Sequence, residues 1–74
     1  MSKQINIGQL IKEEIEHKGL SRTCLAKESF IDRRQLYRIF KRKSIDTDIL
    51  FNLSVQLKHD FFKLYSEELA KKIA

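Results

Sequence analysis

The stretch from Leu20 to Lys43, LSRTCLAKESFIDRRQLYRIFKRK, decides the predicted fold. Ser21 is a good N-cap, and the residues that follow it predict a short helix over residues 22–28. The pattern then breaks for three residues, and Asp32 supplies the N-cap of a second helix, predicted over residues 33–41. The stretch therefore predicts two short helices joined by a tight turn.

The second of these helices has two distinct faces. Successive residues of an α-helix are about 100° apart, which brings its apolar residues together on one side and a row of basic residues on the opposite side. The apolar face consists of Leu36, Ile39 and Phe40, and the basic face of Arg34, Arg38 and Lys41. Such a helix can rest on a small core while it presents positive charge outward.

Positive charge is concentrated in this part of the chain. Residues 22–43 contain eight bases and two acids, a net charge of +6, whereas the remaining residues contain seven bases and eight acids, a net charge of −1. A surplus that served only solubility would be scattered, whereas a footprint for a polyanion is concentrated. The distribution favours nucleic acid or another anionic surface as the partner. A membrane surface is the weakest of these, because few large apolar residues back the basic face.

Helical spacing of apolar residues continues on both sides of this stretch. It predicts helices over residues 7–18, 47–58 and 61–72, the first ended by Gly19 in a left-handed cap and the second capped by Asp46 or Thr47. The fold class is therefore all-α, with five helices in a single domain over residues 1–74. The predicted core contains Ile7, Leu10, Ile11, Ile15, Leu25, Ala26, Leu36, Ile39, Phe40, Leu50, Leu53 and Leu57, with Ile49 or Val55 beside it and Phe61 and Leu64 as candidates to close it.

Composition excludes several classes of function. The chain has 74 residues, no proline and one cysteine, so it is one small domain without an internal disulfide. It contains no membrane-length apolar run and no hydrophobic leader, which predicts a cytoplasmic protein. The two histidines lie far apart and no glycine-rich phosphate loop is present, so we expect no metal, no cofactor, no small-molecule ligand and no enzymatic activity.

The stretch from Leu20 to Lys43 resembles the helix-turn-helix of the Cro/CI-like, or XRE-type, repressors of bacteria and phages. That family has a polar residue at the start of its second helix and a small residue four positions later, here Arg22 and Ala26. It also has a buried aliphatic residue just before the third helix, so the resemblance adds Ile31 to the predicted core. The resemblance spans roughly residues 7–62 and implies a lambda-repressor-like DNA-binding domain, a transcriptional regulator encoded by a bacterium, phage or plasmid. Residues 60–66, DFFKLYS, look like a variant found in small regulators of Bacteroidetes-type bacteria.

The resemblance implies a set of DNA-binding residues. Arg33, Arg34 and Arg38 match the positions that contact base edges in the major groove, where the planar fork of arginine fits guanine O6 and N7. Gln35 would contact adenine or a phosphate. The remaining residues expected to bind the DNA backbone are Lys41, Arg42, Lys43, Ser21, Arg22 and Thr47. RNA remains open as an alternative to duplex DNA.

Phe30 departs from the family pattern, which usually has glycine at this position of the turn. A phenylalanine at positive φ would cost on the order of 1 kcal/mol or more. We therefore expect the turn to be rearranged by one residue. Ser29 and Arg22 also replace a leucine and a glutamine of the family pattern, and the second change removes an amide that could brace a neighbouring side chain.

Three other features allow two interpretations each. Tyr37 would either stack on a sugar or base, or cover the edge of the core. Cys24 is expected to be a small, partly buried residue of the second helix, with redox sensing as the less favoured role. The C-terminal helix carries more apolar residues than a small monomer buries easily, which favours a homodimer over the alternative that Phe61 and Leu64 close the core and the other apolar residues are ordinary surface. The expected dimer face consists of Phe62, Tyr65, Leu69 and Ile73. Alternatively, this helix docks a protein partner in an adaptor or antitoxin-like module whose DNA contact is secondary.

Overall fold

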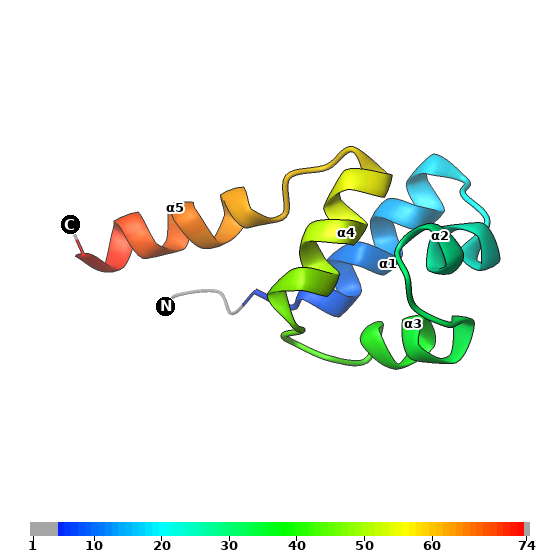
Figure 1. Ribbon diagram of the computed structural model, residues 1–74. Helices are drawn as coiled ribbons and strands as arrows, with labels where there is room; N and C mark the ends of the chain where they lie inside the picture. Colours follow the sequence, from blue (N-terminus) through cyan, green and yellow to red (C-terminus); the bar gives the residue numbers. More distant parts are fainter. Residues whose placement is uncertain (1–4, 74) are drawn as a thin grey trace.

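The computed structural model describes residues 5–73, which form five α-helices and contain no β-strand (Figure 1). The helices are α1 (Ile7–Lys18), α2 (Arg22–Glu28), α3 (Arg33–Ile39), α4 (Thr47–Leu57) and α5 (Phe62–Ile73). The prediction of an all-α chain with five helices is thereby confirmed. Residues 1–4 and 74 of the predicted single domain lie outside the described residues.

Capping residues explain where the first four helices begin and where α1 ends. The side chains of Asn6, Ser21, Asp32 and Asp46 each accept a hydrogen bond from a backbone N–H two or three residues further along, at 2.6–3.3 Å. Of the two alternatives for α4, Asp46 is therefore the cap. Gly19 ends α1 at φ 64°, the left-handed conformation that glycine adopts with little strain.

The core lies between α1, α2, α3 and α4. Of the predicted core residues, Leu10, Ile31 and Phe40 are only partly buried, and Ile49 rather than Val55 packs beside the inner face of α4. Phe61, in the turn before α5, is buried and belongs to the same core. The buried apolar residues are Ile7, Ile11, Ile15, Leu25, Ala26, Leu36, Ile39, Leu50, Leu53, Leu57 and Phe61.

The end of α3 differs from the sequence prediction. The helix stops at Ile39, two residues before the predicted Lys41. The backbone tightens at this point, because Lys41 N–H donates to Arg38 O at 3.1 Å and Arg42 N–H donates to Ile39 O at 3.0 Å. These bonds span three residues instead of the four of an α-helix. The chain therefore leaves α3 earlier and carries its last basic residues in a loop.

Helix α5 points away from the other four helices, which makes the molecule elongated, 40 × 22 × 21 Å (Figure 1). It begins one residue later than predicted and has no buried residue. The linker before it is attached to α1, since His59 Nδ1 lies 3.3 Å from Glu14 Oε2; Lys18 Nζ also donates to the carbonyl oxygen of Leu57, the last residue of α4. The position of the first turn of α5 is thus fixed by contacts of its linker rather than by burial of the helix itself.

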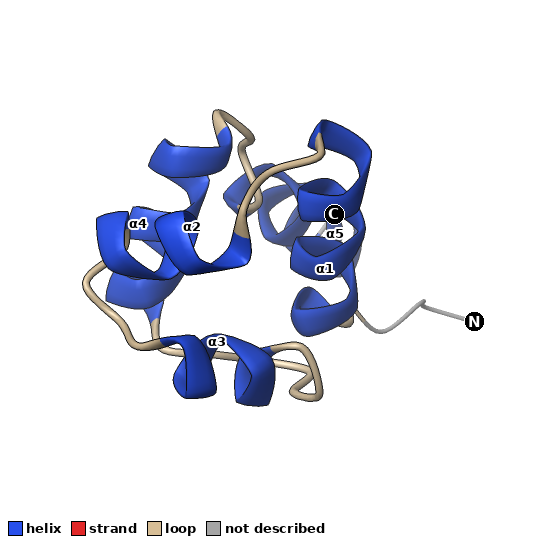
Figure 2. Ribbon diagram, turned by 90° about the vertical axis from the view of Figure 1, so that its right-hand side faces the viewer, coloured by secondary structure: helices blue, strands red, loops and turns tan. Residues whose placement is uncertain are grey.

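The view in Figure 2 places α3 at one edge of the bundle, below α1, α2 and α4, and no other helix covers its outer side in this view. Four of the seven residues of α3 are exposed: Arg33, Arg34, Tyr37 and Arg38.

Candidate nucleic-acid interface

The turn between α2 and α3 keeps a left-handed residue, and that residue is Phe30 at φ 62°. The expected one-residue rearrangement is therefore wrong. Ile31 N–H donates to Ala26 O at 3.0 Å and Phe30 N–H donates to Lys27 O at 3.2 Å, the two hydrogen bonds of a Schellman ending. Ile31 also packs against the core, so its burial and both bonds hold the turn. The Phe30 side chain is 86% exposed and meets no obstacle that would force another backbone conformation.

Three arginines on α3, Arg33, Arg34 and Arg38, are exposed. At about 100° per residue, Arg34 and Arg38 lie opposite the buried Leu36 and Ile39, whereas Arg33 lies at the flank of the buried face, on the side of Tyr37. The three ion pairs among residues 5–73 use Arg22, His59 and Lys71 as bases, and none of them neutralises the α3 arginines. The face therefore presents positive charge that no carboxylate of the described chain compensates.

The loop after α3 adds three more bases to this surface. The side chains of Lys41, Arg42 and Lys43 are exposed, while the backbone beneath them is held by α1. Ile7 N–H donates to Lys43 O at 3.1 Å and Gly8 N–H donates to Arg42 O at 2.9 Å. The loop thus offers exposed charged side chains on a backbone held by hydrogen bonds to α1, which suits contacts to phosphates.

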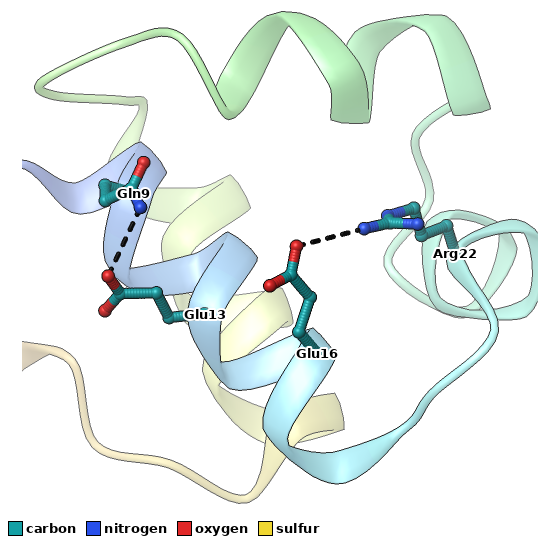
Figure 3. Close-up of polar contacts among 4 residues, drawn as sticks. All are labelled: Gln9, Glu13, Glu16 and Arg22. Carbon is teal, nitrogen blue, oxygen red and sulfur yellow. Dashed lines mark hydrogen bonds and ion pairs between the residues drawn. The ribbon is translucent and has the colours of Figure 1, made fainter.

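Arg22 is engaged within the protein. Figure 3 shows its guanidinium reaching from α2 to Glu16 on α1, with an Nη2–Oε1 distance of 3.5 Å. Its Cζ atom also lies 6.0 Å from the ring centroid of Tyr37 and 5.8 Å from that of Phe40. The guanidinium therefore joins α1, α2 and α3, and only part of it faces solvent.

Tyr37 lies between two guanidinium groups. Arg33 Cζ is 5.7 Å from its ring centroid, and the edge of the ring meets Phe40 at 5.7 Å and an interplanar angle of 88°. Hydrogen bonding to Arg33 is the largest influence on the Tyr37 phenol and lowers its pKa; desolvation opposes this lowering, and the positive charges of Arg33 and Arg22 add to it. Tyr37 both covers the core edge at Phe40 and keeps 40% of its surface exposed.

The other predicted contacts differ in their surroundings. Ser21 is exposed and its hydroxyl accepts from Cys24 N–H, while Gln35 is half-buried at the start of α3. Thr47 is exposed but stands between two carboxylates, those of Asp46 and Asp48. Because neighbouring negative charge opposes the binding of phosphate, the N-terminus of α4 is the least favourable of the predicted anion contacts.

The prediction that Cys24 is partly buried is wrong, because this residue is exposed on α2. The reason is the register of this short helix, which directs the next two residues, Leu25 and Ala26, into the core.

The predicted dimer face forms one apolar stripe along α5. Its members recur every three or four residues, so they share a side of the helix, and all of them are exposed. Leu64 lies on another side, where it lines a groove of about 430 Å³ together with Ile5 and Leu10. Partial burial raises the pKa of the Tyr65 phenol. Helix α5 therefore turns Leu64, with Glu67 and Glu68, toward α1 and leaves its apolar stripe uncovered within residues 5–73.

Two functional features escaped the sequence prediction. The first is Gly8, whose close approach to α3 was signalled by an isolated glycine within a helical pattern. The second is the contact of Arg22 with Tyr37 and Phe40. No pattern within one segment announces it, because these residues belong to different helices and meet only after the helices pack.

Comparison with family models, with curated proteins and with solved structures found no match to this chain. Among residues 5–73, no helix combines the length and the apolar character that spanning a bilayer requires.

Proposed function

We propose that this chain is a sequence-specific duplex DNA-binding transcriptional regulator with a lambda-repressor-like, Cro/CI-type helix-turn-helix. The observation that carries the proposal is the row of exposed, uncompensated arginines on α3, whose opposite face is buried in the core. A major groove admits one α-helix, and its base edges differ between base pairs. Arg33, Arg34 and Arg38 would read those edges, with Gln35 beside them.

Phosphate contacts would fix the register of α3 in the groove. Lys41, Arg42 and Lys43 support this role through exposed side chains on a held backbone. Ser21 and Arg22 at the start of α2 are further candidates, and Thr47 is the weakest. Such contacts position a protein on the duplex without reading its sequence. The regulator would act in the cytoplasm by occupying a promoter and so excluding or recruiting polymerase.

A homodimer through α5 would double this surface. The exposed stripe of α5 supports self-association, because monomers rarely leave a helix with one apolar side uncovered. Two-fold symmetry would pair two α3 helices about 34–36 Å apart, one turn of B-DNA, and would match a pseudo-palindromic site. The same stripe supports the second candidate function, a protein-binding adaptor or antitoxin-like module in which DNA contact is secondary.

Selection from a pool of random duplexes, followed by fluorescence titration of the selected site at two salt concentrations, tests the proposal. We expect a defined consensus, together with an affinity that falls steeply as salt increases. The variant Arg33→Gln, Arg34→Gln, Arg38→Gln should lose the preference for that consensus. Its matched control is Lys63→Gln, Lys71→Gln, Lys72→Gln, which removes the same charge from α5. A pool without a consensus, or an equal loss in both triple variants, would contradict the proposal.

A further inference from the structure

The ring of Tyr37 lies between Arg33 on the exposed side of α3 and two residues packed closer to the core, Arg22 and Phe40. The Tyr37 ring has the Arg33 guanidinium 5.7 Å from its centroid and the Arg22 guanidinium 6.0 Å from it. Arg33 and Tyr37 are four residues apart on α3 and therefore lie on the same side of that helix. Arg22 reaches the ring from the start of α2.

The ring is held by further contacts. Its edge packs on Phe40, which is itself partly buried against the core. Arg22 also lies over Phe40 at 5.8 Å, and Glu16 on α1 binds its guanidinium at 3.5 Å (Figure 3). The Nε atom of Arg22 is buried and has no hydrogen-bond partner among residues 5–73. Burial of this unpaired donor costs desolvation free energy, which the other contacts of the side chain must offset. A continuous series of contacts thus runs from Glu16 through Arg22 and Tyr37 to Arg33.

The Arg33 guanidinium, whose Cζ atom lies 5.7 Å from the Tyr37 ring centroid, carries five N–H donors in one plane. Its interaction with the Tyr37 hydroxyl uses part of that set and leaves other N–H groups for a base edge. Bidentate reading of guanine needs two such N–H groups. An arginine held on a ring also loses less rotamer freedom on binding than one that samples solvent.

We infer that Tyr37 is a positioning residue that orients Arg33 for base reading, with Arg22 and Glu16 holding the ring from the protein side. The inference rests on the proposed DNA-binding function and adds to it a residue that determines specificity without itself contacting a base. Arg22 would then act mainly through Tyr37 and only secondarily on a phosphate.

The contact itself is tested in the free protein. The chain has two tyrosines, so ultraviolet titration of Tyr65→Phe reports the phenol of Tyr37 alone. Arg33→Gln in this background should shift the Tyr37 midpoint to higher pH, because it removes the interactions that favour the phenolate. Arg34→Gln removes an equal charge from the neighbouring position and should shift it much less. Equal shifts in the two variants would overturn the contact.

The role is tested on the selected duplex and on duplexes that each change one base pair. Tyr37→Leu should weaken binding to the selected site about two- to fivefold, the size expected for one exposed cation–π contact. The loss should fall on the same base position as that of Arg33→Gln, and the double variant should add little. Tyr37→Phe keeps the ring and removes only the hydroxyl, so it should restore part of the preference that Tyr37→Leu loses.

The possible failures are distinguishable. A uniform loss on every duplex, or an unchanged preference in Tyr37→Leu, overturns the positioning role while DNA binding stands. If wild-type protein selects no duplex, the proposed function fails and the positioning role fails with it. Thermal unfolding of each Tyr37 variant separates a lost contact from a lost fold, and Tyr37→Phe remains the decisive variant if Tyr37→Leu is unstable.

Discussion

The backbone N–H of Gly8 donates to the carbonyl oxygen of Arg42 at 2.9 Å, which brings the first turn of α1 directly against the loop after α3. A Cβ atom on Gly8 would lie 2.2 Å from Ile39 O and 2.4 Å from Arg42 O, both of them backbone atoms. The hydrogen bond can form only because Gly8 has no side chain. Together, the hydrogen bond and the close approach fix the position of the basic loop relative to α1.

Gly8→Ala should strongly destabilise the protein. The added methyl group overlaps backbone that cannot move without separating α1 from α3, so we expect a loss of about 2–3 kcal/mol or more in the free energy of unfolding. Gly19→Ala is the matched control. A Cβ there meets nothing within 4 Å, and only the cost of φ 64° remains, about 1 kcal/mol. Urea denaturation measures both, and equal losses would contradict the close approach.

Phe30→Gly should leave the protein as stable as wild type or up to about 1 kcal/mol more stable. Phe30 adopts a left-handed conformation that glycine reaches without strain, and its exposed ring contributes little packing. Phe30→Val is the opposing variant, because a β-branched residue fits this conformation worse than phenylalanine does. Thermal unfolding should rank glycine first and valine last. The reverse order would mean that the turn does not hold a positive φ.

Arg38→Ala should weaken binding to the selected duplex by about 1–3 kcal/mol and relax the preference at one base position. The reason is that a bidentate contact is lost at a single base. Lys27→Ala removes an exposed charge from α2 and should leave the base preference unchanged. Titration of duplexes with single base-pair changes measures the effect. Equal weakening on all of them would refute base reading by Arg38.

Lys43→Ala should weaken binding on every sequence to the same extent. If Lys43 neutralises one phosphate, its removal lowers the slope of log K against log salt by about one unit. Lys63→Ala on α5 is the control and should keep the wild-type slope. Titration at several salt concentrations gives the slopes, and a wild-type slope in Lys43→Ala would exclude the phosphate contact.

Leu69→Glu should convert a dimer into a monomer. The substitution introduces a charge into the exposed apolar stripe of α5, where a second copy would bury it. Val55→Glu changes an exposed apolar residue of α4 in the same way and serves as the control. Sedimentation equilibrium should give a dimeric mass for wild type and Val55→Glu. A monomeric wild type would leave the stripe to a different protein partner, as in the adaptor hypothesis.

Local physical chemistry explains why most of the fold was predictable. The side chains of N-cap residues such as Ser21 and Asp32 accept hydrogen bonds from backbone N–H groups of their own segment. The left-handed conformation of Gly19 likewise needs no partner from a distant segment. The 3.6-residue periodicity of buried residues then follows from helix geometry alone. For the same reason the outward direction of Arg34 and Arg38 could be predicted once Leu36 and Ile39 were assigned to the core.

The sequence by itself therefore determined the presence and order of the five helices, the caps Ser21, Asp32 and Gly19, most of the core residues and the concentration of positive charge in the middle third of the chain. Only the tertiary structure decided that Phe30 keeps a left-handed turn, that Gly8 meets Arg42, and that Arg22 turns toward Tyr37. It also decided that α5 leaves the bundle. These outcomes depend on distances between segments remote in sequence, and such distances are set by packing of the whole chain rather than by the preferences of any one segment.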